Sequence, residues 1–436
     1  MLKVVKFGGS SLADAEHFKK AAEIVKAESS RHFVVPSAPG KRFKDDDKVT
    51  DLLYSCYDAA NLGENIDDSF EKIENRYRDI IKGLGISLSL EEEFQVIRDS
   101  FMHKAGRDYA ASRGEYLNGL IMAHYLGCEF VDAADVIFFR EDGSFDAERT
   151  NTILGQYLRE HDHAVIPGFY GSMPNDTIKT FSRGGSDITG SIVARATMCD
   201  VYENWTDVSG FMMADPRIVN NPKPIDVITY RELRELAYMG AGVLHEEAIF
   251  PVRFAGIPIN IRNTNDPTAA GTMIVPDAPV GDRIVTGIAG KKGFSVITVD
   301  KELMNTEIGF GRRLLSVLER ERINFEHLPS GIDTMSVVVA TPVLQGRRDR
   351  IMDEICDMLN PDSIHIEDHL ALIAVVGRGM KAAKGTAARV FTSISKADVN
   401  IKMIDQGSSE LNIIVGVEDV DFEKTMRAIY EEFVGD

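Results

Sequence analysis

The N-terminal strand and the glycine turn after it constrain the fold most. Leu2–Phe7 is typical of a short buried strand, and Gly8 and Gly9 allow a sharp turn and a close approach to a ligand. Four apolar residues at helical spacing follow: Phe18, Ala21, Ala22 and Val25. A strand, a glycine turn and a helix aim free backbone N–H groups at an anion. With Lys6 just before the turn, the segment is either a phosphate-binding turn or a glycine-capped connection with a lysine at its edge.

The composition bounds the class of protein. A chain of 436 residues predicts two to four domains. Its net charge of −19 argues against nucleic acid as a partner and means that an anionic ligand needs a local cluster of cations. The sequence has neither a signal-peptide pattern nor an apolar run of membrane-spanning length, and its four cysteines form no CxxC pair. We expect a cytoplasmic protein with reduced thiols and no membrane association.

Strands alternate with helices as far as Arg262, which predicts a mainly parallel sheet covered by helices on both faces. Ligands of such sheets bind beyond the carboxyl ends of the strands. Several expected strands end in glycine-rich turns: Ser37–Lys41, Gly168–Gly171 and Ser182–Asp187. Residues 61–110 carry helical periodicity without strand signals, so we interpret them as a helical insertion that forms a lid or a side lobe.

Two of the motifs carry charged residues that suit a ligand. In Ser-Arg-Gly-Glu at 112–115, Glu115 stands at the expected entry of a helix, where it either caps the helix or binds a substrate ammonium. In the second Gly-Gly turn, the planar guanidinium of Arg183 suits a carboxylate or a phosphate. Asp187 either caps the next helix or orients an amine or Lys6. Two strand–Gly-Gly–helix turns with cations in one chain favour an anion-binding cleft.

A third candidate segment follows the expected strand Asp200–Trp205. It begins Thr206-Asp207-Val208-Ser209-Gly210-Phe211 and continues to Arg217. A polar strand end, a glycine, an aromatic ring and an arginine suit a base, a ribose and a phosphate, although a plain loop has a similar composition.

An internal repeat lies beyond a boundary region at 263–282, in which Asn, Asp, Pro, Gly and Thr dominate. An offset of 76 residues relates Gly309 to Gly385 and Asn324 to Asn400 (385 − 309 and 400 − 324). Each copy is typical of a strand, a glycine loop, a helix and further strands, which predicts two ferredoxin-like βαββαβ units. Neither copy carries a nucleophile–base pair or metal-ligand spacing.

Six motifs, taken in order, resemble those of the aspartate kinases (aspartokinases) of the amino acid kinase family: Lys6–Ser11, Ser37–Lys41, Lys48–Leu52, Ser112–Glu115, Arg183–Asp187 and Trp205–Val208. The repeated C-terminal copies are similar to the tandem ACT regulatory domains of that family. The resemblance implies an amino acid kinase-like catalytic domain over residues 1–282, which includes the helical insertion, and ACT-like units over 283–362 and 363–436.

The resemblance also implies a reaction. ATP, with Mg²⁺ on its phosphates, would phosphorylate the β-carboxylate of L-aspartate to give 4-phospho-L-aspartate, the first step toward lysine, threonine and methionine. The catalytic residues would be Lys6, Asp187 and Arg183, with Lys6 stabilising the phosphoryl group in flight. Residues expected to bind aspartate are Ser37, Thr50, Glu115, Arg183 and Ser186. Those expected at the nucleotide are Lys6, Gly8, Gly9, Ser10, Thr206, Asp207, Phe211, Arg217, Gly242 and Val243. A carboxylate nucleophile needs no general base, so alignment and charge neutralisation should carry catalysis.

The chain departs from the family pattern at a few positions. Family members often have lysine where Gly242 stands and proline where Glu246 stands, so a phosphate-facing cation is missing. Lys41 or Arg217 would have to replace it. Two further differences concern hydroxyl groups, Ser10 in place of threonine and Phe211 in place of tyrosine.

The ACT-like units imply feedback control by an end-product amino acid, with lysine, alone or with threonine, as the first candidate. The resemblance places the effector near Met304, Gly309, Phe310 and Asp333. It also implies a homodimer, or a tetramer, joined through these units.

Two other functions compete with this interpretation. One is another kinase of the superfamily, acting on glutamate, UMP or carbamate, against which Glu115, Arg183 and the repeat argue. The other is a catalytically inactive amino-acid sensor, against which the intact Lys6 and Asp187 argue. The sequence lacks a Walker A loop, the protein-kinase signatures and a Rossmann GxGxxG after a strand.

Overall fold

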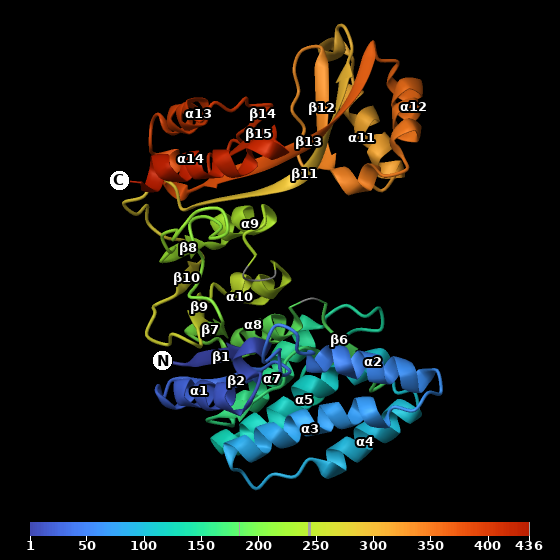
Figure 1. Cartoon of the computed structure of the whole chain (residues 1–436), viewed down its shortest axis with the longest axis vertical. Coiled ribbons are helices and arrows are strands. Elements are labelled where there is room, and N and C mark those ends of the chain that lie inside the picture. Colours follow the sequence, from blue (N-terminus) through green and yellow to red (C-terminus); the bar gives the residue numbers. More distant parts are fainter. Residues whose placement is uncertain (183, 243–245, 436) are drawn as a thin grey trace. The chain divides into compact units, whose positions relative to one another are not determined.

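The computed structural model describes residues 1–182, 184–242 and 246–435 and divides into two compact units (Figure 1). The first consists of Met1–Phe211, Ile225–Tyr230 and Val243–Ala278. The second consists of Met212–Pro224, Arg231–Gly242 and Pro279–Asp436. Residues 212–224, 231–242 and 279–282 of the predicted catalytic range therefore belong to the second unit.

A mainly parallel sheet forms the centre of the first unit. Its strands are β1 (Lys3–Phe7), β2 (Arg31–Pro36), β3 (Glu129–Phe130), β4 (Ala164–Val165), β7 (Val201–Thr206), β8 (Val227–Thr229), β9 (Ile259–Asn263) and β10 (Thr272–Val275). Their order is β3-β4-β2-β1-β7-β9-β10-β8, and among the described pairs β9 and β10 alone are antiparallel. A separate hairpin joins β5 (Tyr170–Ser172) to β6 (Ile178–Thr180). The predicted mainly parallel sheet is confirmed.

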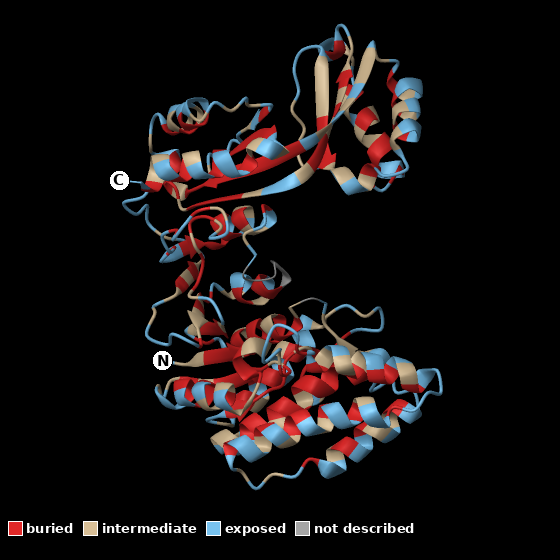
Figure 2. Cartoon of the chain, in the orientation of Figure 1, coloured by how far each residue is buried: buried red, intermediate tan, exposed pale blue. Residues whose placement is uncertain are grey.

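Helices flank this sheet. They are α1 (Ala15–Lys26), α2 (Val49–Asn61), α3 (Asp67–Leu84), α4 (Glu91–Met102), α5 (Arg107–Leu126), α6 (Ala133–Val136), α7 (Ala147–Arg159), α8 (Gly185–Thr197) and α10 (Phe250–Ala255), with single 3-10 turns η1 (Gly9–Leu12) and η2 (Glu246–Ile249); α9 (Tyr230–Tyr238) belongs to the second unit from Arg231 on. In most of these helices the inward face is buried and the outer face exposed (Figure 2), whereas α5 is buried on nearly all sides. None of the helices in the described part of the chain is long and apolar enough to cross a membrane.

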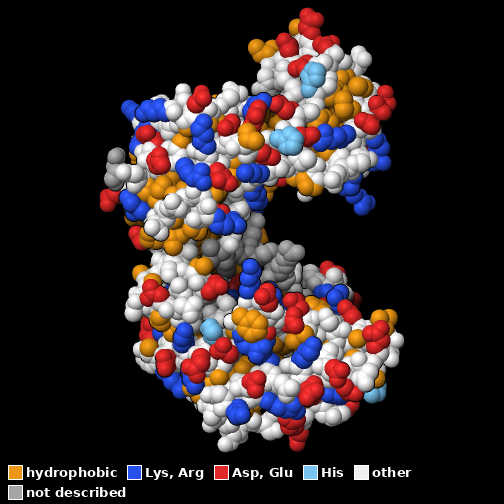
Figure 3. Space-filling model, viewed as in Figure 1, with side chains coloured by type: hydrophobic (Ala, Val, Ile, Leu, Met, Phe, Trp, Pro, Cys, Tyr) orange, Lys and Arg blue, Asp and Glu red, His pale blue; other side chains and the backbone are white. Residues whose placement is uncertain are grey.

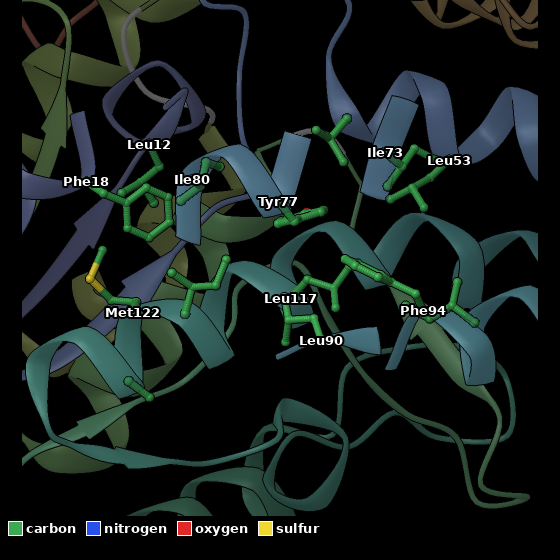
Figure 4. Packing of buried hydrophobic residues seen from close by; sticks show 14 of the residues in the cluster. Leu12, Phe18, Leu53, Ile73, Tyr77, Ile80, Leu90, Phe94, Leu117 and Met122 are labelled. Atoms are coloured by element: carbon green, nitrogen blue, oxygen red, sulfur yellow. The ribbon is translucent and has the colours of Figure 1, made fainter. Parts of the chain in front are cut away.

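The helical insertion belongs to the main hydrophobic core. Phe70, Ile73 and Tyr77 of α3 and Phe94 of α4 join one buried cluster with Leu12, next to the glycine turn. Figure 4 shows Ile73, Tyr77 and Phe94 in the same cluster as Leu117 and Met122 of α5 and Phe18 of α1. The expectation of a separate lid or side lobe is wrong, because the apolar stripe of α3 packs into the same core as the first strand.

Strand register brings the turns to one edge of the sheet. Phe7, at the end of β1, pairs with Pro36 in β2 and with Trp205 in β7. The chain therefore leaves all three parallel strands at the same edge, where Gly8, Ser37 and Thr206 follow. The carboxyl ends of parallel strands are the usual place for a ligand site.

A five-stranded antiparallel sheet forms the second unit, in the order β12-β11-β13-β15-β14. The strands are β11 (Gly287–Asp300), β12 (Thr334–Ala340), β13 (Ser363–Val376), β14 (Met403–Asp405) and β15 (Asn412–Glu418). The helices are α11 (Phe310–Arg320), α12 (Arg348–Leu359), α13 (Thr386–Lys396) and α14 (Phe422–Val434), with 3-10 turns η3 (Met304–Thr306), η4 (Thr341–Leu344), η5 (Arg378–Lys381) and η6 (Asp419–Asp421).

The repeat seen in the sequence appears in the second unit. The helices α11 and α13 are related by the same offset of 76 residues, and the glycines before them, Gly309 and Gly385, have φ angles of +79° and +85°. The two copies share strands, since β11 and β13, each 14 residues long, run side by side through both halves. The first part of β11, Gly287–Lys291, pairs with the end of β13 that also pairs with β15. The C-terminal copy of the repeat therefore includes a strand that precedes the N-terminal copy in the sequence.

Charged side chains of both signs are interspersed over the face shown in Figure 3. The negative net charge is therefore not gathered into one acidic patch on that face.

Candidate active site

The glycine turn after β1 presents free backbone donors. The Gly8 N–H bonds to the Trp205 carbonyl (3.0 Å) and the Ser11 N–H to the Gly8 carbonyl (3.0 Å). In the described part of the chain, the N–H groups of Gly9 and Ser10 between them form no hydrogen bond. Two adjacent unpaired N–H groups are a site for an anion.

The donors belong to the 3-10 turn η1 and not to the α-helix that the sequence predicts there. The helix α1 begins later, at Ala15, and the Asp14 carboxylate caps it by accepting from the His17 N–H (3.0 Å). Because a carboxylate already occupies the positive end of α1, the predicted phosphate site at this helix terminus moves back to Gly9 and Ser10.

The Gly9 turn packs backbone to backbone against the loop after β2. The Gly40 N–H donates to the Gly9 carbonyl (2.8 Å). A Cβ on Gly40 would lie 2.6 Å from the Gly9 carbonyl carbon, and a Cβ on Gly9 would lie 2.9 Å from the Ala38 carbonyl oxygen. The sequence needs glycine at both positions because two chain segments cross here.

An ion pair lies beside the same glycine turn, since a Cβ on Gly8 would lie 3.5 Å from Lys6 Nζ. The Lys6 side chain is buried in β1, and its Nζ lies 2.5 Å from Oδ1 of Asp187 in the first turn of α8. Asn204, the neighbour of Lys6 in β7, donates from Nδ2 to the same Asp187 oxygen (2.8 Å). Its own Oδ1 lies 3.5 Å from Lys6 Nζ. Asp187 and Asn204 therefore fix the direction of the ammonium group, as the sequence predicts for Asp187.

Glu115 contributes a second buried ionisable group to the same site. Burial raises the pKa of its carboxyl to about 8, opposed by the Ala38 N–H, the Ser186 hydroxyl and the charge of Lys6. Its Oε2 is buried and has no hydrogen-bond partner among the described residues. A buried carboxylate oxygen without a donor is costly, so it marks a place where a ligand can supply one.

The alternative that Glu115 caps a helix is wrong. The helix α5 begins at Arg107, so Glu115 lies well inside it. Gly114 is needed there for close packing, because a Cβ on it would lie 2.7 Å from the Ala38 side chain. The helix thus approaches the Ser37–Gly40 loop closely enough to aim Glu115 at the site.

The residues expected to hold the β-carboxylate lie on both sides of that loop. The Ser37 N–H donates to the Phe7 carbonyl (3.0 Å), and its carbonyl accepts from Asn118 Nδ2 (2.7 Å). Thr50 lies in the first turn of α2. Arg183, expected to bind the α-carboxylate, lies outside the described residues.

The residues expected at the nucleotide are divided between the units. Thr206 and Asp207 lie at the end of β7, where their side chains bond to each other (3.2 Å). Phe211 is buried, and its N–H donates to Thr272 (2.8 Å). Arg217, in the second unit, is exposed and paired with Asp215 (2.6 Å). Gly242 also belongs to the second unit, and Val243 lies outside the described residues.

Comparison with known proteins identifies the family of the chain. The model of the amino acid kinase family matches residues 1–263, and a model of the ACT domain matches residues 373–433. Aspartokinase 3 of Bacillus subtilis (strain 168) is 40% identical, over 99% of this chain and 98% of the relative. The chain belongs to the aspartokinases of the amino acid kinase family. It is therefore a kinase with a C-terminal ACT portion.

Solved aspartokinase structures share the fold. An aspartate kinase of Clostridium acetobutylicum superposes with a TM-score of 0.94 at 53% identity, covering 99% of this chain and all of that one. The E. coli aspartokinase III, in complex with aspartate and ADP, gives a TM-score of 0.77 at 24% identity over the full length of both chains. At that identity the second likeness shows the fold alone.

The residues expected at the aspartokinase effector site gather in the second unit. Met304, Gly309 and Phe310 lie in and just after the segment that joins β11 to α11, and Met304 and Phe310 are buried. Asp333 accepts from the Leu303 N–H through its carboxylate (2.9 Å) and so lies against the same segment.

Sequence reasoning missed three polar residues around the aspartokinase site: Asn204, Asn118 and Arg76. Asn118 has a local signal, since it lies within an apolar helical stretch, whereas Asn204 reaches the site through strand pairing. Arg76 lies on the stripe formed by Ile73, Tyr77 and Ile80, where a buried charge requires a partner.

Proposed function

We propose that this aspartokinase transfers the γ-phosphoryl group of ATP to the β-carboxylate of L-aspartate, giving 4-phospho-L-aspartate and ADP. The observation that carries the proposal is the buried, unpartnered Oε2 of Glu115 beside the Lys6–Asp187 pair. An α-ammonium group is the ligand that pairs with the Glu115 carboxylate. A transferring phosphoryl group is the ligand that suits the Lys6 ammonium.

Substrate binding follows from these positions. The α-ammonium of aspartate would donate to Glu115, and Arg183 would hold the α-carboxylate. The β-carboxylate would then extend toward Ser37 and Thr50. Glutamate is one methylene longer, so its reacting carboxylate would be displaced from the same position.

Phosphoryl transfer needs no proton donor or acceptor from the chain. A β-carboxylate oxygen attacks the γ-phosphorus, a C–O–P bond forms, and the bond from phosphorus to the ADP oxygen breaks with its electrons on ADP. The negative charge on the γ-phosphoryl oxygens would be met by Lys6 and by the N–H groups of Gly9 and Ser10. The Asp187 carboxylate would keep Lys6 pointed at the transferring group.

Mg²⁺ is proposed as part of the nucleotide substrate. No group of three or more His, Cys, Asp and Glu side chains that would hold a metal occurs within the described ranges. We therefore assign the ion to the ATP phosphates, where it would neutralise their charge.

We further propose feedback control of this reaction, as the first step of lysine, threonine and methionine biosynthesis, by lysine alone or with threonine. Met304, Gly309, Phe310 and Asp333 would bind the effector, and the chain would act as a cytoplasmic homodimer or tetramer. The E. coli aspartokinase III is solved in complex with lysine and aspartate, so lysine is the first amino acid to test.

A coupled assay of ADP release by the purified full-length chain tests the proposal. We expect release with L-aspartate to exceed release with L-glutamate or without an amino acid by at least about 100-fold, and to fall when lysine is added. Equal rates with aspartate and glutamate, or release that is independent of both, would contradict the assignment.

A further inference from the structure

One arginine of the helical insertion holds the loop that crosses the Gly9 turn. The Arg76 side chain is buried, 5% exposed, although it lies on a helix rather than in a strand of the site. Its Nη1 donates to the Gly40 carbonyl (3.1 Å), and its Nη2 lies 2.7 Å from an Asp46 oxygen. Longer contacts reach the carbonyls of Ala13 (3.5 Å) and Asp47 (3.4 Å).

Asp46 closes the loop on itself. Its carboxylate accepts two bonds from the Arg42 guanidinium and one from the Arg42 backbone N–H, each 2.9 Å. These bonds, together with the charge of Arg76, hold the pKa of Asp46 well below its usual range. Asp46 is also buried, 7% exposed, so the loop from Gly40 to Asp47 is fixed at both ends by one ionic cluster.

The cluster connects directly to the atoms proposed to bind phosphate and ammonium. Gly40, which Arg76 holds by its carbonyl, donates its N–H to Gly9. The next residue of α3, Tyr77, donates its hydroxyl to the Gly114 carbonyl (2.8 Å), one residue before Glu115. One turn of α3 therefore supports both halves of the site.

We propose that Arg76 is a positioning residue for phosphoryl transfer, acting through the Gly40 loop on the free N–H groups of Gly9 and Ser10. The inference rests on the proposed function of that site. Arg76 would contact no reactant. It would hold the loop against the turn, so that the phosphate donors and the aspartate-binding residues keep their relative positions.

The test compares Arg76→Met with a matched variant of the same helix, Arg78→Met. Arg78 is partly exposed on α3, where it pairs with Glu91 (2.7 Å) and its guanidinium lies over the Phe94 ring. In the full-length chain we expect Arg76→Met to lower kcat about 10- to 100-fold while KM for aspartate changes less than about threefold, since misalignment affects the reacting geometry most. Arg78→Met should keep both constants.

A second readout follows the loop itself. Limited trypsin digestion should cut Arg76→Met faster than the wild type after Lys41, Arg42 or Lys44, and should leave Arg78→Met unchanged. Arg76→Lys, which keeps the charge beside Asp46 but not the forked donors, should fold and recover part of kcat.

These experiments test the positioning role of Arg76 separately from the proposed function. If Arg76→Met folds, retains the kcat of Arg78→Met and is cut no faster, the proposal is overturned. If Arg76→Met fails to fold, Arg76→Lys decides, and wild-type kcat with wild-type digestion in that variant would overturn it. If the wild type itself shows no aspartate-dependent turnover, the proposed function fails, and the digestion pattern alone supports or rejects the anchoring of the loop.

Discussion

Glu115 and Lys6 define the site at the scale of single residues. Both are buried, and a buried charge is kept in a folded protein when it is paired or when a ligand pairs it. Lys6 already has Asp187, whereas one oxygen of Glu115 has no partner among the described residues. In the proposed reaction this difference gives the two residues different tasks: Lys6 would face the transferring group and Glu115 would bind the substrate amine.

The raised pKa of Glu115 predicts a pH dependence of aspartate binding. With a pKa of about 8 in the ligand-free chain, the carboxyl is protonated at pH 6 and must lose its proton to pair with an ammonium. KM for aspartate should therefore fall as pH rises, by about tenfold per unit well below the pKa, and level off above it.

Kinetics from pH 6 to pH 9 on Glu115→Gln check this assignment. The variant should show a high KM for aspartate with no such slope, because an amide has no proton to lose. Glu92→Gln, which changes an exposed glutamate, is the control and should follow the wild type. A wild-type slope retained in Glu115→Gln would remove Glu115 from ammonium binding.

The motifs predicted the single residues better than their surroundings. Lys6, Asp187 and Glu115 lie in short motifs, so a few neighbouring residues are enough to suggest their chemistry. Asn204 lies next to Lys6 because two strands far apart in the sequence pair in one register, and no local pattern contains that pairing. Sequence reasoning of this kind finds the charges and misses the neutral groups that orient them.

At the scale of elements, the site depends on close packing between α5, the Ser37–Gly40 loop and the Gly9 turn. The sequence predicted the strands and glycine turns but misplaced the start of α5. The motif at 112–115 predicts a helix entry at Glu115, whereas α5 begins at Arg107 and Gly114 allows its close contact with Ala38. The strand β10, only four residues long, was hidden in the predicted boundary region because so short a run has no distinct period.

Gly40→Ala tests the packing of the loop on the turn. Its Cβ would lie 2.6 Å from the Gly9 carbonyl carbon, so the backbone must shift. We expect a loss of about 1–3 kcal/mol in the free energy of unfolding, measured by urea titration, together with reduced turnover. Gly281→Ala, at an exposed glycine with open space around it, is the control. Identical stability and turnover in the two variants would show that the loop and the turn are not tightly packed.

At the scale of the whole molecule, the segment Arg231–Gly242 belongs to the second unit, although the residues before and after it in the sequence belong to the first. The Glu232 side chain of α9 is fully buried and accepts from the Arg378 backbone N–H (2.8 Å), the Arg378 guanidinium (2.8 Å) and the Thr286 hydroxyl (2.6 Å). The family resemblance places α9 within the catalytic range, residues 1–282. Its membership of the second unit depends on these distant polar partners, which the local pattern does not contain.

Arg378→Met should therefore destabilise the second unit. Removing one partner of a buried ion pair leaves a buried charge with less compensation, which costs about 3–5 kcal/mol. The measurement is the free energy of unfolding of that unit, obtained by urea titration. Arg312→Met, at an exposed position of α11, is the control and should change the free energy of unfolding by less than about 0.5 kcal/mol. An equal, small effect of both substitutions would show that Glu232 is not held through Arg378.

The central claim is that one buried site joins an amine-binding carboxylate to a phosphoryl-binding ammonium, and trapping the product with hydroxylamine tests it most directly. With ATP, Mg²⁺ and L-aspartate, the wild type should form aspartate β-hydroxamate, identified by mass spectrometry. Lys6→Ala should form none within detection, at least about 1,000-fold less, while still binding aspartate in equilibrium dialysis. Near-normal hydroxamate formation by Lys6→Ala, or a wild type that releases ADP without forming the hydroxamate, would contradict the account.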